Sequence, residues 1–319
     1  MYKIDLSEQL FDIQSFQIRN CECNFIQRAN SYFDMYEKFL QRIMVSQDIL
    51  RQFQTFSRNI KLCLLEYYAG QHDSSRYYFC EAMRGVDCQQ ILACLDDKIF
   101  YRARRQEEKA RSTECTFSKD EMFHITFEKR YRVATQRYSY PGLPCLYLGA
   151  SVAVCCDELN CRDENLNIAV VEKWGSKDVW IVDLFFFKNY NFNFLTKQQY
   201  DTFITLWPLV ACCSFVYSET TDMNFRPDYI LPQLLLEFVI DLKAEYGIRG
   251  DDKEIIGIRY HSVKKTFWNL ASETTEQDYV NYVFPALTVE ESGYCKSLQQ
   301  HFDVKTVVLL KQIGDTNDI

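Results

Sequence analysis

The hydrophobic pattern of the chain changes in kind near residue 95, and this change fixes the class of fold. Before it, apolar residues such as Phe33, Tyr36 and Leu40 recur three and four positions apart, which is the spacing of one helix face. From Ile99 onward the apolar residues form short, partly β-branched runs of strand length. We therefore predict an α+β protein with a helical N-terminal domain over 1–95 and a mixed α+β domain over 96–319.

Turn and cap residues divide these regions further. Gly70 stands where the C-cap of a helix is expected, and His72–Ser75 could cap the start of the next helix. We therefore predict three or four helices over Asn24–Leu95. Another helix is predicted over Asp228–Tyr246, closed by Gly247. Strands are predicted over Ile99–Ala103, Met122–Phe127, Cys145–Leu148, Asn167–Val171, Val179–Phe187, Ile255–Tyr260 and Val304–Leu310.

Charge and hydropathy restrict where such a protein works and what it binds. A net charge of −8 argues against nucleic acid, whose phosphate backbone needs a broad basic surface. No apolar run approaches the roughly 18 residues of a membrane span, so no membrane association is expected. Residues 1–14 carry charges and lack the continuous apolar stretch of a signal peptide. We expect a cytoplasmic protein.

Fourteen cysteines raise the possibilities of disulfides and of zinc. In a cytoplasmic protein the thiols should stay reduced and pack as small apolar groups. The close pairs Cys21/Cys23, Cys155/Cys156 and Cys212/Cys213 lack the two-residue spacer of a zinc knuckle, and in strands adjacent cysteines would face opposite ways. We expect neither disulfides nor a metal.

Polar residues that could carry chemistry gather in three places of the second region. The first is the basic stretch Tyr101–Arg105, followed by Lys109 and Arg111. Most of these charges fit a solvated loop equally well. Arg102 differs because it lies in a predicted strand, where an arginine is costly unless it is paired or binds an anion.

The second place is the segment Gln136–Gly149 with the carboxylate that follows it. Arg137 and Tyr138 precede a Pro-Gly turn, and the strand after the turn contains Tyr147. Eleven residues later Glu158 lies in the apolar segment Ala153–Leu159. A carboxylate there must be paired, protonated or functional.

The third place is Gly257–Val263, which contains Ser262, with Asn281 about twenty residues further on. Side chains at strand ends are positioned by a rigid scaffold, which favours binding and catalysis there. A serine after a strand is, however, more often a cap or a turn residue.

The order of these residues resembles the RES domain family, which is named for its Arg, Glu and Ser. The series is Tyr-Arg at 101–102, Arg-aromatic-x-x-Pro-Gly-x-Pro-x-Leu-Tyr-Leu at 137–148, Ala153 followed by Glu158 in the segment 153–158, and Tyr-x-Ser at 260–262. The resemblance covers about 99–287 and is most specific over Arg137–Glu158. The chain departs from the family at Thr135, Ser139 and Tyr140, where Gly, Asn and Pro are usual, and at Ser151–Ala153, where Ser-Pro-x is common.

The resemblance implies an NAD-degrading enzyme with a fold similar to that of ADP-ribosyltransferases. NAD would be the substrate, no separate cofactor would be needed, and cleavage would fall on the nicotinamide–ribose bond. The family pattern assigns catalysis to Glu158, Arg137, Tyr147 and Ser262, and substrate binding to Tyr101, Arg102, Arg137, Tyr138, Ser262 and Asn281. Arg102 and Arg137 would grip the pyrophosphate, because guanidinium groups match phosphate oxygens bidentately.

The sequence leaves the acceptor and the biological setting open. Water would make a glycohydrolase, phosphate a phosphorylase, and a protein side chain an ADP-ribosyltransferase. A toxin or defence effector that depletes NAD would need restraint by an antitoxin, a regulatory protein or its own homo-oligomer. A non-catalytic nucleotide sensor is the alternative from another class. A further alternative gives the whole function to the helical region as a docking domain, against its plainer role as a packing and regulatory lobe.

Overall fold

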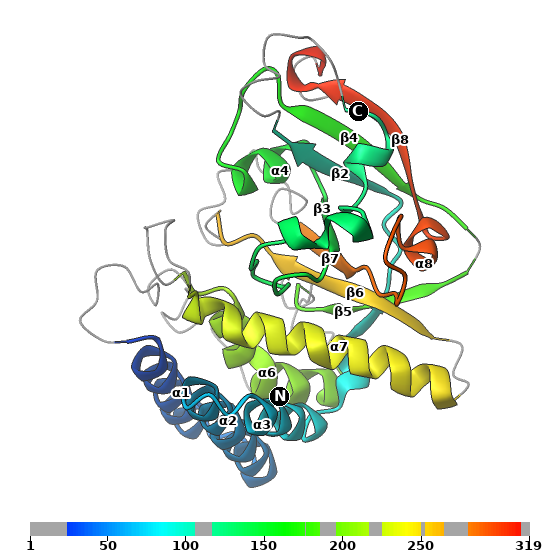
Figure 1. Ribbon diagram of the computed structural model, residues 1–319. Coiled ribbons are helices and arrows are strands. Elements are labelled where there is room, and N and C mark those ends of the chain that lie inside the picture. The colour runs from blue at the N-terminus through cyan, green and yellow to red at the C-terminus, as the bar shows by residue number, and fades with distance from the viewer. Residues whose placement is uncertain are drawn as a thin grey trace. The chain divides into compact units, whose positions relative to one another are not determined.

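The computed structural model shows an α+β protein with a helical N-terminal region and an eight-stranded sheet (Figure 1). It describes residues 24–105, 117–175, 177–185, 196–216, 225–249, 253–264 and 280–313. The predicted strand residues 186–187 and the basic residues Lys109 and Arg111 lie outside these ranges, as do Cys21 and Cys23.

The chain divides into two compact units, which we call the helical unit and the sheet unit. The helical unit takes its described residues from Met1–Ala93 and Asp183–Asp241, and the sheet unit from Cys94–Val182, Leu242–Lys265 and Leu270–Ile319. The first change of unit falls close to the predicted boundary at residue 95. The sequence analysis treats 96–319 as one uninterrupted domain. In the structure Asp183–Asp241, inside that range, belongs to the helical unit instead.

Three N-terminal helices confirm the prediction for this region: α1 (Phe25–Arg42), α2 (Gln47–Tyr68) and α3 (His72–Arg84). The side chains of Asn24 and Ser46 cap the first two by accepting backbone hydrogen bonds. After α2, Gly70 has a φ of 76°, the left-handed conformation that glycine adopts without strain. The predicted cap of α3 is wrong: the helix starts at His72 itself after Gln71, which makes no side-chain cap.

The helical unit is completed by α6 (Lys197–Cys213) and by the start of α7 (Ile230–Arg249). After its first turn α6 is buried at every residue except Asp201, so the helix shows no amphipathic pattern in its sequence and was not predicted. The indole N–H of Trp207 donates to the hydroxyl of Tyr32 at 2.9 Å, which ties α6 to α1. A 3-10 turn at Pro227–Tyr229 precedes α7. The helix does not end at Gly247, as predicted, but continues to Arg249. None of the helices in the described ranges has both the length and the apolar content needed to cross a membrane.

The sheet has the strand order β1-β5-β6-β7-β3-β2-β4-β8. Five successive pairs, from β6 with β7 to β4 with β8, are antiparallel. The strands are β1 (Leu92–Cys94), β2 (Ile99–Arg104), β3 (Cys145–Gly149), β4 (Asn167–Lys173), β5 (Val179–Asp183), β6 (Glu254–His261), β7 (Val280–Pro285) and β8 (Phe302–Leu309). The predicted strands at these positions are confirmed, except that β5 ends at Asp183 rather than continuing to residue 187.

One predicted strand, Met122–Phe127, is wrong. The segment instead connects two 3-10 turns, one at Asp120–Met122 and the other at Phe127–Arg132. Met122, Phe123 and Phe127 are buried there, and the intervening His124 accepts a hydrogen bond from the backbone N–H of Cys295 at 2.9 Å. Burial of a short irregular segment therefore produced an apolar run that imitates a strand.

Two short elements complete the sheet unit: α4 (Val152–Glu158) after β3, and α8 (Lys296–Gln299) before β8. The hydroxyl of Ser151 caps α4 by accepting from the backbone N–H of Val154 at 3.2 Å. Because Cys155 and Cys156 lie in α4 and Cys212 and Cys213 in α6, the opposite-face argument made for cysteines in strands does not apply to them.

We predict that Gly257→Ala destabilises the sheet unit by about 2 kcal/mol. A Cβ at Gly257 would lie 2.3 Å from the carbonyl oxygen of Val283 in β7 and 2.6 Å from the Phe284 ring. Because the closest atom belongs to the backbone of a paired strand, it cannot move without disturbing the β6–β7 ladder. Chemical denaturation of wild type and variant measures the effect, and an unchanged midpoint would contradict it.

Candidate functional site

Two of the predicted site residues converge on one carboxylate oxygen of a third. The hydroxyl of Ser262 donates to Oε1 of Glu158 at 2.6 Å, and the side-chain amide of Asn281 donates to the same oxygen at 2.7 Å. Ser262 and Asn281 are 1% and 4% exposed, so both donors are almost fully shielded from water. Residues 123 positions apart in the chain thus form one hydrogen-bonded centre.

The centre is assembled by the register of three strands and by the close packing of α4. Glu158 is the last residue of α4, Ser262 directly follows β6, and Asn281 lies in β7 opposite Gly149 of β3. A Cβ at Gly149 would lie 2.6 Å from Val154 Cγ1 and 2.7 Å from Cys155 Sγ. The missing side chain therefore lets α4 pack against the end of β3, which brings Glu158 to its two donors.

A group of aromatic and basic side chains surrounds Tyr260, the residue of β6 opposite Asn281. The rings of Tyr138 and Tyr260 are 4.4 Å apart. Burial raises the pKa of Tyr260 well above its ordinary value, and the charge of Glu158 and the hydroxyls of Tyr147 and Tyr138 raise it further, whereas Arg137 lowers it. Four predicted site residues thus lie within electrostatic reach of Tyr260.

Tyr260 itself received no role in the sequence analysis, although it belongs to the Tyr-x-Ser motif. The signal that could have found it is its place two residues before Ser262 in a strand, because alternate residues of a strand share a face. Its hydroxyl stays neutral at physiological pH, since its pKa is raised. It can therefore both donate and accept hydrogen bonds beside the Glu158 carboxylate.

Tyr101 and Arg102 lie on opposite faces of β2. Tyr101 packs with Val154 and Cys155 of α4, so it belongs to the same face as Glu158. Its neighbour Arg102 must point the other way. Its Nη1 donates to the carbonyl oxygen of Phe123 at 2.6 Å, and burial lowers the pKa of its guanidinium to about 10.

The packing of β7 also places Arg102 on the face of the sheet opposite to Glu158. Tyr282, adjacent to Asn281, packs edge-on against Phe100 with ring centroids 5.0 Å apart. Phe100 and Arg102 share a face because they are two residues apart in β2. The structure therefore does not bring Arg102 together with Glu158 and Arg137, contrary to the convergence expected from the sequence.

The other two arginines of the stretch Tyr101–Arg105 donate hydrogen bonds to backbone carbonyls. Nη1 of Arg104 donates to the carbonyl oxygen of Glu121 at 2.7 Å. The guanidinium of Arg105 donates to the carbonyl oxygens of Leu159 and, at 3.2 Å, of Asn160. Arg105 therefore covers the carbonyl end of α4 with positive charge, which favours that end of a helix.

The arrangement around Glu158 suits a ligand that carries hydroxyl groups. Both hydrogen bonds from the protein reach Oε1, and within the described part of the chain Oε2 receives none. The two groups that hold this carboxylate, a hydroxyl and an amide, are both neutral donors. Such a group can accept a hydrogen bond from a sugar hydroxyl or stabilise a developing positive charge.

Comparison with known proteins finds one similar curated protein and leaves the family open. The chain is 29% identical over 296 residues to a Bacillus subtilis (strain 168) protein named "Putative toxin YopC". The match covers 87% of this chain and 63% of that protein, so the chain spans less than two thirds of the relative's length. No family model matches the chain, and no solved structure matches it.

We predict that Asn281→Asp destabilises the sheet unit by about 2 kcal/mol at pH 7 and less in acid. The change would place a second carboxylate where the amide now lies 2.7 Å from Glu158. Repulsion would raise the pKa of one carboxyl above its value in the unfolded chain, so the penalty is present above that raised pKa and disappears as pH falls through it.

Denaturation of Asn281→Asp and wild type at pH 7, 5.5 and 4.5 measures this difference. The matched control is Asn165→Asp, an exposed position, which should shift stability little at any pH. A penalty for Asn281→Asp that does not shrink in acid would contradict the paired geometry.

His124, next to the carbonyl that Arg102 binds, should weaken the fold in acid. Burial, with a smaller contribution from the charge of Arg102, lowers the pKa of its imidazole to about 4, although the hydrogen bond with the Ile125 carbonyl acts in the opposite direction. The folded protein therefore binds fewer protons than the unfolded chain between about pH 6.5 and 4, and stability should fall by about 2–3 kcal/mol across that window. His124→Gln should show a flatter dependence there. An NMR titration in which the His124 resonance moves near pH 6.5 would contradict the prediction.

Proposed function

We propose that this chain is an NAD-degrading enzyme of the RES type, a glycohydrolase or phosphorylase, acting as a toxin. The observation that carries the proposal is the carboxylate of Glu158, held by Ser262 and Asn281, with Arg137 and two tyrosines within electrostatic reach of the neighbouring Tyr260. These are the Glu, Ser and Arg that the motif resemblance assigns to NAD cleavage. The similarity to a protein named as a toxin supports the biological role.

The reaction would begin by breaking the bond between ribose C1′ and the nicotinamide nitrogen. Nicotinamide leaves as a neutral ring and takes the bonding electron pair, which leaves positive charge on the ribose. Glu158 would accept a hydrogen bond from a ribose hydroxyl through Oε2 and stabilise this charge, an interaction stronger in the transition state than in the ground state. Ser262 and Asn281 hold the carboxylate in place.

The tyrosines and Arg137 would position the dinucleotide. Tyr101, Tyr138 and Tyr147 offer aromatic surface to the cationic nicotinamide or its ribose. Arg137 remains the predicted grip on the pyrophosphate. The role predicted for Arg102 has less support, because its guanidinium is bound to Phe123 and faces away from Glu158.

A toxin that consumes NAD needs restraint in the cell that makes it. The proposal therefore includes a restraining partner, an antitoxin or regulatory protein, or assembly of several copies. It also includes a cytoplasmic location, where the NAD pool would be the target.

We predict that the purified protein releases nicotinamide from NAD and that Glu158→Gln lowers this rate by at least about 100-fold. The amide is nearly the same size, so the variant should fold, but it cannot supply the negative charge. Mass spectrometry of the products with and without phosphate distinguishes ADP-ribose, its 1-phosphate and an ADP-ribosylated protein.

Two results would decide against the enzyme. An unchanged rate in Glu158→Gln would remove this residue from the chemistry. Saturable NAD binding without nicotinamide release would favour a nucleotide sensor. Glu164→Gln, an exposed carboxylate in the same unit, is the control and should leave the rate unaltered.

A further inference from the structure

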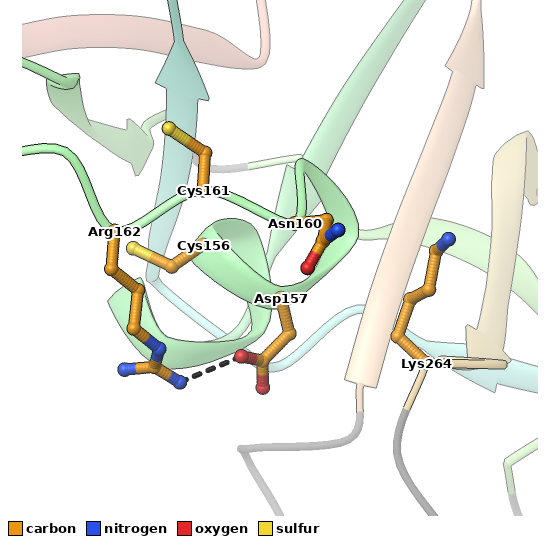
Figure 2. Close-up of a pocket in the computed structure, with 6 residues that line it drawn as sticks. All are labelled: Cys156, Asp157, Asn160, Cys161, Arg162 and Lys264. Carbon is orange, nitrogen blue, oxygen red and sulfur yellow. Dashed lines mark hydrogen bonds and ion pairs between the residues drawn. The ribbon is translucent and has the colours of Figure 1, made fainter.

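A cavity of about 500 Å³ lies beside the last turn of α4, next to the Glu158 centre. Its lining residues are Cys156, Asp157, Asn160, Cys161, Arg162 and Lys264 (Figure 2). The volume falls in the range of small-molecule sites. All six residues belong to the sheet unit.

The cavity is joined to the candidate active centre by a short chain of hydrogen bonds. The backbone N–H of Lys264 donates to the Ser262 hydroxyl at 3.2 Å, and this hydroxyl donates to Glu158 at 2.6 Å. Asp157, on the other wall, directly precedes Glu158 in α4. Two residues that line the cavity are therefore linked to Glu158, Asp157 by the peptide chain and Lys264 through the Ser262 hydroxyl.

The charges of the lining favour an anion, in a chain whose net charge is −8. Among the described residues of the lining, Arg162 and Lys264 are the two cations and Asp157, which pairs with Arg162 at 2.6 Å, is the one carboxylate. In Figure 2 Arg162 and Lys264 lie on either side of Asp157 and Asn160. Arg105 adds a further positive charge at the carbonyls that end α4.

We propose that this cavity is a phosphate-binding site and, resting on the proposed function, that it holds the diphosphate of the dinucleotide. Arg162 would offer a planar donor fork to one phosphate, and Lys264 a point charge to the other. The Asn160 amide would donate between them. The cavity thus supplies, on the side of Glu158, the second cationic grip that Arg102 cannot give from the other face.

Binding of inorganic pyrophosphate, measured by calorimetry without any turnover, tests the site directly. Lys264→Gln and Arg162→Gln should each weaken binding about fivefold to tenfold, and Asp157→Asn should strengthen it, because Arg162 is released from its pair. Lys129→Gln, an exposed lysine in a 3-10 turn of the same unit, is the matched control and should bind as wild type. Circular dichroism verifies that each variant folds.

The two sources of phosphate are separated by competition. ADP-ribose should displace pyrophosphate, whereas orthophosphate should compete weakly. Displacement by orthophosphate but not by ADP-ribose would overturn the assignment to the diphosphate. Pyrophosphate affinity unchanged in both Lys264→Gln and Arg162→Gln would overturn the site itself.

These results are independent of the test of NAD cleavage. If pyrophosphate binding depends on Arg162 and Lys264 while nicotinamide is never released, the phosphate site stands and the enzyme proposal fails. If nicotinamide is released and both variants bind pyrophosphate normally, the enzyme proposal stands and the phosphate site fails.

Discussion

The hydrogen bonds to one oxygen of Glu158 join three parts of the sheet unit that are distant in sequence. They connect the end of α4, the end of β6 and the start of β7. A buried amide and hydroxyl without acceptors would each be costly, so Asn281 and Ser262 need the carboxylate as much as it needs them. The same interaction therefore supports the fold and shapes the candidate site.

The sequence predicted the parts of this architecture that depend on local periodicity. Strands such as Cys145–Leu148 and Ile255–Tyr260 were found because their residues are apolar, short in extent and bounded by turns. α6 was missed because a helix buried on all sides has no polar face to reveal its period. Met122–Phe127 was mistaken for a strand because burial, rather than strand pairing, selects its apolar residues.

For the site, the motif identified the residues but only the fold could show which of them meet. Glu158, Ser262 and Asn281 converge through strand register and through the absence of a side chain at Gly149, neither of which is visible in the motif. Arg102 shows the converse. Neighbours in a strand point to opposite faces, so Tyr101 and Arg102 could not both contact one ligand on the face of α4. Alternation applied to the predicted strand would already have separated them.

The interrupted course of the chain affects how the protein is made. β5 and β6 are neighbours in the sheet, yet the segment between them includes α6 and much of α7, which fold with the N-terminal helices. During synthesis the ribosome releases Glu158 well before Ser262 and Asn281, so the carboxylate has neither donor until residue 262 has emerged. A nascent chain cannot complete the centre around Glu158 until translation has passed residue 281, which keeps partly made molecules without an assembled site.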